Sequence, residues 1–185
     1  MFLTKSNFFK ELKISFQVFG VGVVLGIILA SVAKMNAQEF FRNLLEANQD
    51  IFQAAQTGNY FELTFSIFKQ NLTTAFIIVA LGVLHRYLSL AIIFFNGILL
   101  GIVILLASEL GLSVPKILQM LLPHGVFEIP ALLLAGALAI KLSHPGRGFS
   151  DRFKTLLKST SALLVIALLL IIAALIESYS IITLR

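Results

Sequence analysis

The chain has 185 residues, of which 58% are hydrophobic and only 12% are charged, and its formal net charge is +5. Its mean hydropathy is +0.98, and several apolar runs approach the ~20 residues that a helix needs to cross a bilayer, which excludes a soluble globular protein. Since there is no cysteine, disulfides, thiol catalysis and cysteine-bound metal centres are excluded too. Basic residues in such a chain are typical of span ends that face anionic headgroups, so no nucleic-acid partner is expected.

The N-terminal part predicts a surface helix followed by a span. Residues 1–13 alternate apolar and lysine side chains, which indicates an amphipathic helix in the membrane interface. Residues 14–33 form the first predicted span. A cleaved signal peptide is the alternative, because Ser31-Val32-Ala33 resembles a cleavage site, but the apolar run exceeds the ~7–15 residues of a signal core, which favours a retained span. Gly22 and Gly26 lie one turn apart and predict close contact with another helix.

Residues 37–56 are the most polar stretch of the chain. Their apolar residues recur at spacings of three, four and seven, which predicts one amphipathic helix, and Gly58 within Thr57-Gly58-Asn59 ends it. The segment is too polar to span the membrane. We expect it to lie on the membrane surface or to cap the bundle, with binding to a partner protein as the alternative.

The second and third spans are predicted at residues 60–84 and 88–107. Since only a very short turn separates them, they should be antiparallel neighbours. An asparagine lies inside each of them, Asn71 in the second span and Asn96 in the third. Three further glycines are predicted to be helix-packing positions, and two of them form a GxxxG pair: Gly82, Gly97 and Gly101.

The apolar run at 114–142 contains a break. Pro123, Gly125 and Pro130 lie close together in it, and each proline removes a backbone donor and clashes with the preceding turn. A straight helix of this length would reach roughly 43 Å, which exceeds the ~30 Å of the hydrocarbon core. The run is therefore either a tilted, broken helix or a re-entrant half-helix followed by the fourth span, and the break favours the re-entrant form. Gly136 is another predicted packing position.

The last span is predicted at residues 160–176, ending before Glu177. With five spans, the basic residues are distributed unevenly between the two sides of the membrane. With the N-terminus inside, the inner side carries Lys5, Lys10, Lys13, Arg86, Lys141, Arg147, Arg152, Lys154 and Lys158, and the outer side carries Lys34, Arg42, Lys69, Lys116 and Arg185. This bias predicts a multi-pass protein of the cell (inner) membrane with a cytoplasmic N-terminus and an external C-terminus.

Four polar side chains inside the apolar runs form the candidate site: Asn71, Asn96, His124 and Glu128. His124 and Glu128 are one helical turn apart and share a face if that turn is helical. One interpretation is a proton-handling pair, or an ion or substrate site, at a discontinuous helix. The other is structural: the two asparagines hydrogen-bond the freed backbone, and Glu128 pairs with His124 or stays protonated. Both interpretations stay open.

The sequence contains no recognisable catalytic set. His124 and Glu128 do not have the HExxH spacing of a zinc helix, and neither a nucleophile elbow nor a phosphate-binding loop occurs. We therefore predict no catalytic residue, no metal site and no cofactor, and a non-enzymatic protein.

Several of these residues together resemble the stage II sporulation protein M family. The matching pattern is Asn71 with Gly82, then Asn96-Gly97 with Gly101, then the box from Leu122 to Ala131 (Leu-Pro-His-Gly-Val-Phe-Glu-Ile-Pro-Ala) followed by Gly136. The resemblance covers roughly residues 71–142, and the five-span layout extends it loosely to the whole chain. One departure is Ala139, where the family often has a second glycine.

The resemblance implies an all-α, polytopic membrane bundle. The member after which the family is named is a multispanning scaffold that helps assemble peptidoglycan-remodelling proteins during engulfment in spore formers. We therefore expect a membrane scaffold or assembly protein that forms homo-oligomers and contacts membrane lipids and other membrane or cell-envelope proteins. The alternative is a small channel or transporter that uses His124 and Glu128.

Overall fold

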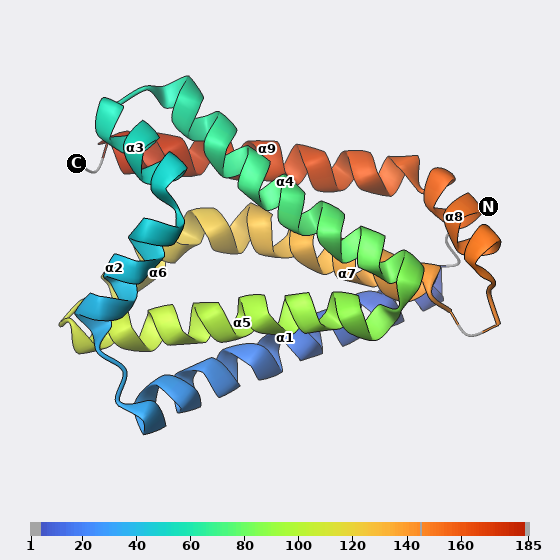
Figure 1. Cartoon of the computed structure of the whole chain (residues 1–185), viewed down its shortest axis with the longest axis horizontal. Coiled ribbons are helices and arrows are strands. Elements are labelled where there is room, and N and C mark those ends of the chain that lie inside the picture. Colours follow the sequence, from blue (N-terminus) through green and yellow to red (C-terminus); the bar gives the residue numbers. More distant parts are fainter. Residues whose placement is uncertain (1–4, 145, 184–185) are drawn as a thin grey trace.

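The computed structural model describes residues 5–144 and 146–183, and the regular structure in this part of the chain is helical throughout (Figure 1). The elements follow in the order α1 (Lys5–Ala33), α2 (Ala37–Ala47), α3 (Gln49–Thr57), α4 (Tyr60–Leu84), α5 (Arg86–Glu109), α6 (Val114–Pro123), η1 (His124–Glu128), α7 (Ile129–Leu142), α8 (Phe149–Leu157) and α9 (Thr160–Thr183).

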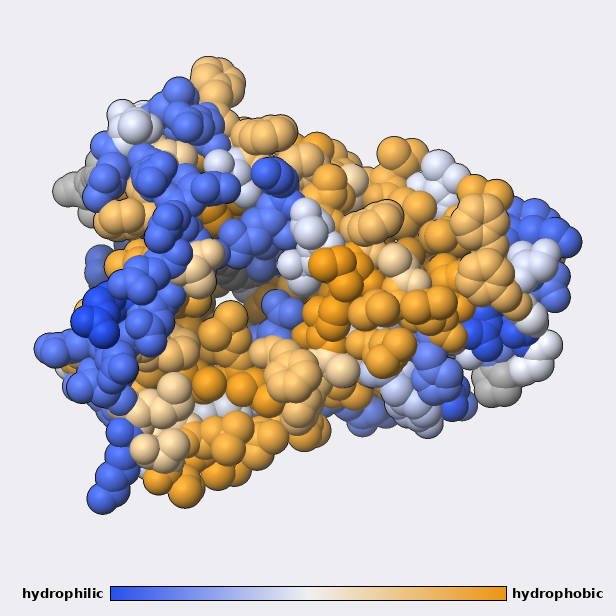
Figure 2. All heavy atoms as spheres, in the orientation of Figure 1, coloured by the Kyte–Doolittle hydropathy of each residue, from blue (hydrophilic) through white to orange (hydrophobic). Residues whose placement is uncertain are grey.

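Within the described residues, five helical segments are long and apolar enough to cross a membrane. They are Phe8–Ala33, Tyr60–Leu84, Arg86–Glu109, Gly125–Leu142 and Thr160–Thr183. Figure 2 shows the corresponding hydrophobic belt, with hydrophilic residues gathered at the two ends of the molecule. The chain is therefore a multi-pass membrane protein, and the predicted all-α bundle is confirmed.

Helix α7 lies at the centre of the bundle. It contacts α1, α4, α5 and α9, and most of its residues are buried. A helix that is apolar on every side is stable only where other helices surround it or lipid does. The small side chains of Ala131, Ala135, Gly136 and Ala139 let its neighbours approach closely.

Helix α1 packs more extensively against α5 than any other pair of helices does. Gly22 and Gly26 of α1 face Gly97 and Gly101 of α5, so that each helix offers a glycine pair to the backbone of the other. A Cβ added at Gly97 would collide with the Phe19 carbonyl oxygen. The two predicted small-residue motifs thus meet each other within one chain.

Helices α4 and α5 form the predicted antiparallel hairpin (Figure 1). His85 alone separates them, in an extended conformation with φ −160° and ψ 131°. The Ser89 hydroxyl of α5 donates to the Ile78 carbonyl of α4 at 2.6 Å, and this bond fastens the base of the hairpin.

Helix α1 differs from the prediction of a separate interfacial helix at 1–13. It runs without interruption from Lys5 to Ala33, because no glycine or proline precedes Gly20, and residues 1–4 lie outside the described part. It ends where Lys34 takes the left-handed conformation, with φ 48°. Lysines near its start can extend their ammonium groups towards the interface, so the helix need not stop there.

The polar segment predicted as one helix at 37–56 forms two helices that cross one end of the bundle (Figure 1). Asn48 interrupts them: its side-chain amide donates to the Leu44 carbonyl at 2.7 Å and competes with the backbone of the next turn. Ala54 of α3 is buried against Leu63 and Ile67 of α4. Helix α2 has no buried residue, although it contacts α5 and α3.

Candidate functional site

The break at Pro123–Pro130 is a π-helical turn. His124–Glu128 form η1, which connects α6 to α7 with continuous helical backbone from Val114 to Leu142. Pro123 is the last residue of α6, and Pro130 lies in the first turn of α7. A π turn inserts one extra residue and shifts the hydrogen-bond pattern, which suits a site where prolines have removed donors.

The re-entrant form favoured by the sequence is therefore wrong, and the broken-helix alternative is the one observed. The chain does not turn back after α6, because its helical backbone continues without interruption through η1 into α7. The membrane-length segment begins only at Gly125, so α6 precedes it. The excess length that suggested a re-entrant helix is thus taken up by α6 at the end of the bundle.

Asn71 and Glu128 meet at this turn. The Asn71 side-chain amide (Nδ2) donates to Oε2 of Glu128 at 3.0 Å, and both side chains are half-buried. Asn71 belongs to the membrane-length segment of α4 and Glu128 to that of η1 and α7. A buried amide N–H group needs a hydrogen-bond acceptor, which a carboxylate provides. Such a hydrogen bond is stronger when the carboxylate is charged than when it is protonated. The contact thus ties the Glu128 carboxyl group, at the break in the helix, to α4.

The other predicted site residues lie apart from this contact or outside the described side chains. The Asn96 amide donates to the Ile92 carbonyl of its own helix at 2.9 Å, so this bond does not serve the broken backbone as expected. An asparagine within a helix has that carbonyl in reach one turn earlier. The side chains of Pro123 and His124 lie outside the described part. A side chain at Gly125 would meet nothing within 4 Å.

Glu177 is a carboxylate in the second half of the membrane-length helix α9, and the sequence prediction missed it. The predicted span ended before Glu177, but α9 continues to Thr183. Glu177 is half-buried, and its Oε2 atom is shielded from solvent. Helix α9 also packs against η1. The apolar pair Ile181-Ile182 after the charge was the available signal, since it continues the helical pattern for another turn.

Helix α4 carries two further polar groups towards α9 near this end. The Tyr60 hydroxyl donates to the Leu175 carbonyl at 3.1 Å. The Thr64 hydroxyl is buried and has no hydrogen-bond partner among the described residues. Thr64 lies two turns before Asn71 on the same side of α4. No group of three or more His, Asp or Glu residues suited to a metal ion occurs in the described ranges.

Two arginines at the opposite end hold helix C-termini. Arg152 of α8 donates through Nη1 to the carbonyls of Val83 and Leu84, at 3.1 and 2.6 Å, where α4 ends. Arg147 donates to the Lys141 carbonyl at 3.0 Å, where α7 ends. The last carbonyls of a helix lack partners within it and carry partial negative charge, which a guanidinium group offsets. These arginines were predicted only as topology signals.

The remaining predicted positions lie at contacts between helices. A Cβ at Gly82 would collide with Ala139 of α7, and one at Gly136 would collide with the Ser15 hydroxyl of α1. Ala139 is the position where the resemblance led us to expect a second glycine, and Gly82 makes room for its methyl group.

A sequence model of one protein family, described as stage II sporulation protein M, matches residues 15–180. Neither a curated protein nor a solved structure matches the chain.

Proposed function

Since the chain belongs to the stage II sporulation protein M family of membrane proteins, we propose that it is a non-enzymatic scaffold that assembles other membrane or cell-envelope proteins. In this proposal it lies in the cell membrane with its N-terminus in the cytoplasm and its C-terminus outside. Membrane lipids surround it, and copies of the chain associate as homo-oligomers.

The observation that carries the scaffold proposal is the role of the family's signature residues inside the bundle. Asn71 contacts Glu128, Gly82 contacts Ala139, and Gly136 contacts Ser15. Gly97 and Gly101 likewise contact α1. Each of these residues joins two helices, which is what a protein needs if its task is to hold a fixed shape in the membrane.

The proposed orientation is supported by the charge at the two ends of the bundle. The end at which α1 starts, α7 ends and α8 lies carries Lys10, Lys13, Arg86, Lys141, Arg147, Arg152, Lys154 and Lys158. The end with α2 and α3 carries fewer basic residues in the described ranges, Lys34, Arg42, Lys69 and Lys116, beside the acidic Glu39, Glu46, Asp50 and Glu62. Lysine and arginine concentrate on the cytoplasmic side of membrane proteins.

Copurification from native membranes tests the scaffold role. The full chain, carrying an affinity tag, is crosslinked in cells, purified and subjected to mass spectrometry beside a tagged membrane protein of similar size. We expect a reproducible set of envelope proteins that is lost when Gly97→Leu separates α1 from α5, and retained in Gly20→Leu, where a side chain has free space. Recovery of the same proteins with the unrelated control would contradict the proposal.

A small proton or ion channel is the second candidate, and the Asn71–Glu128 contact favours it. Intramembrane carboxylates are costly and mark ion pathways in many transporters. Here Glu128 lies at a π turn, an element that occurs often at functional sites, and Glu177 lies on a helix that packs against that turn.

Flux measurements separate the two candidates. Proteoliposomes that contain the full chain and a pH-sensitive dye are compared with proteoliposomes that contain the Glu128→Gln or the Glu109→Gln variant. The Glu109→Gln variant is the control, because Glu109 is exposed. The channel candidate requires proton flux that Glu128→Gln abolishes and Glu109→Gln keeps. Absence of flux in all three contradicts the channel. The scaffold proposal is contradicted if the wild type conducts protons and if complexes with envelope proteins stay intact when the segment from Leu122 to Ala131 is disrupted.

A further inference from the structure

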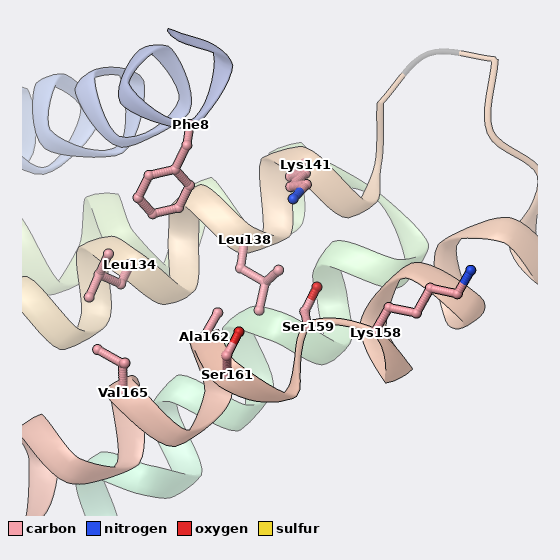
Figure 3. A pocket seen from close by; sticks show the side chains of 9 residues that line it. All are labelled: Phe8, Leu134, Leu138, Lys141, Lys158, Ser159, Ser161, Ala162 and Val165. Atoms are coloured by element: carbon pink, nitrogen blue, oxygen red, sulfur yellow. The ribbon is translucent and has the colours of Figure 1, made fainter. Parts of the chain in front are cut away.

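A pocket of about 290 Å³ opens between α7 and the first turns of α9, at the basic end of the bundle. Phe8 of α1 covers its third side (Figure 3). Helix α7 lies between α1 and α9 and contacts both. The pocket is the space against α7 that the side chains of α1 and α9 do not fill.

The lining of this pocket changes from apolar to polar along its length. Leu134, Leu138 and Val165 surround the part that lies deeper in the bundle, whereas Lys141, Lys158 and Ser159 lie at the outer part (Figure 3). The order is the same on both helices, because α7 runs outward from 134 to 141 and α9 runs inward from 159 to 165. Figure 3 shows the Lys158 side chain extending away from the apolar part.

This change of polarity occurs at the level where a membrane interface is expected. The membrane-length segments of α7 and α9 end at Leu142 and begin at Thr160. The apolar walls therefore lie in the hydrocarbon region and the two lysines at the headgroups. A phospholipid has the same arrangement, with a chain that is apolar and a phosphate that is charged.

The charge around the outer part of the pocket favours an anionic molecule. Besides Lys141 and Lys158, this end carries further basic residues: Lys10, Lys13, Arg86, Arg147, Arg152 and Lys154. Glu11 and Asp151 are the acidic residues described here, and Glu11 is within electrostatic range of Lys141, His144 and Arg147. The balance is clearly positive, and lysines near a membrane surface attract anionic lipids.

We propose that this pocket binds one anionic phospholipid, with an acyl chain against Leu134, Leu138 and Val165 and the phosphate at Lys141 and Lys158. A zwitterionic lipid would be attracted less strongly, because its ammonium group offsets the charge of its phosphate, and free phosphate would leave the apolar walls unfilled. The bound chain contacts Phe8 of α1 as well as α9, so the lipid joins the start of α1 to the start of α9. The site is independent of the proposed scaffold role.

Lipid titration of the purified full chain tests the proposal. Delipidated protein in a neutral detergent is titrated with phosphatidylglycerol, phosphatidylcholine or inorganic phosphate, and the melting temperature and lipid adducts in native mass spectrometry are recorded. We expect one saturable adduct and a higher melting temperature with phosphatidylglycerol alone. The double variant Lys141→Gln, Lys158→Gln should bind it roughly 30-fold more weakly, since each lysine near a membrane surface accounts for about fivefold.

The matched control is Lys154→Gln, which removes an exposed lysine at the same end that does not line the pocket. It should weaken binding by no more than about fivefold.

Ala162→Phe fills the apolar part and keeps both lysines, so it should abolish the adduct even if the double variant fails to fold. Equal binding of both lipids, an effect of phosphate alone, unchanged binding in Ala162→Phe, or equal losses in Lys154→Gln and the double variant would each overturn the proposal.

Discussion

The side-chain amide of Asn71 donates a hydrogen bond to the Glu128 carboxylate at 3.0 Å, although the two residues are 57 positions apart. One partner lies within α4, and the other is the last residue of the π turn. The bond therefore ties the one irregular turn in the run from Val114 to Leu142 to a straight helix beside it. Movement of this turn would have to break the bond or carry α4 along.

Removal of this bond should destabilise the bundle moderately. We expect Asn71→Ala to lower the free energy of unfolding by about 0.6–1.7 kcal/mol, the range found for polar contacts between membrane helices. Denaturant titration in mixed micelles measures the change, and Thr73→Ala, exposed on the same helix, is the control. In a Glu128→Ala background the Asn71 substitution should cost less than about 0.5 kcal/mol, because its partner is gone. Additive costs would contradict a direct contact.

The contact between α1 and α5 should tolerate no added methyl group. Gly97→Ala would push a Cβ into the Phe19 carbonyl oxygen, and backbone cannot yield as a flexible side chain does. We expect a loss of about 1–3 kcal/mol, the usual cost of overpacking. Gly20→Ala in α1 is a matched control, because nothing lies within 4 Å of a Cβ there. It should be neutral or slightly stabilising, since alanine favours helix. Equal destabilisation of both variants would refute the close contact.

Ser15 and Gly136 should show compensation. The Ser15 hydroxyl is fully buried, has no hydrogen-bond partner among the described residues, and occupies the space that Gly136 leaves. Ser15→Ala should therefore change the melting temperature little or raise it, because a buried hydroxyl without a partner is unfavourable. Gly136→Ala should lower it, and the double variant should recover part of the loss. Recovery stays partial because the new Cβ would lie 3.2 Å from Cγ1 of Ile93.

Arg152 should control how firmly α8 is attached to α4. Its guanidinium group binds two carbonyls at the end of α4 and, through Nε, the Arg147 carbonyl at 3.0 Å. We expect Arg152→Gln to cost about 1–2 kcal/mol and to speed modification of a cysteine placed at Phe153. The natural chain has no cysteine, so labelling reports that position alone. Lys154→Gln, exposed in the same helix, should leave the labelling rate unchanged.

The spans were predictable from sequence because their apolar length is a property of single segments. The second span was predicted with the bounds that α4 has, Tyr60–Leu84, and the hairpin followed from the short turn at His85. Asn71 was singled out because an amide in an apolar run needs a partner. The partner expected for that amide was the backbone freed by the prolines, whereas the structure gives it the Glu128 carboxylate.

The remaining features depend on three-dimensional context. A π turn and a re-entrant loop both accommodate Pro123 and Pro130, and the packing around them decides between the two. Asn96 has both the carbonyl one turn earlier in its own helix and the freed backbone as candidate partners, and its spacing in the sequence does not decide between them. Glu177 was placed at the end of a span because a charge is a common boundary signal, whereas the helix runs past it.

The glycine contact between α1 and α5 has a consequence for synthesis. The chain is made from its N-terminus, so α1 enters the bilayer well before the residues of α5 exist. Until then its glycine face is exposed to acyl chains, and α4 and α5 arrive together as a hairpin. Insertion of α5 therefore adds another membrane span and also provides the glycine face of α1 with its packing partner. Gly97→Leu should accordingly delay acquisition of protease resistance by α1 in the membrane more than it delays insertion itself.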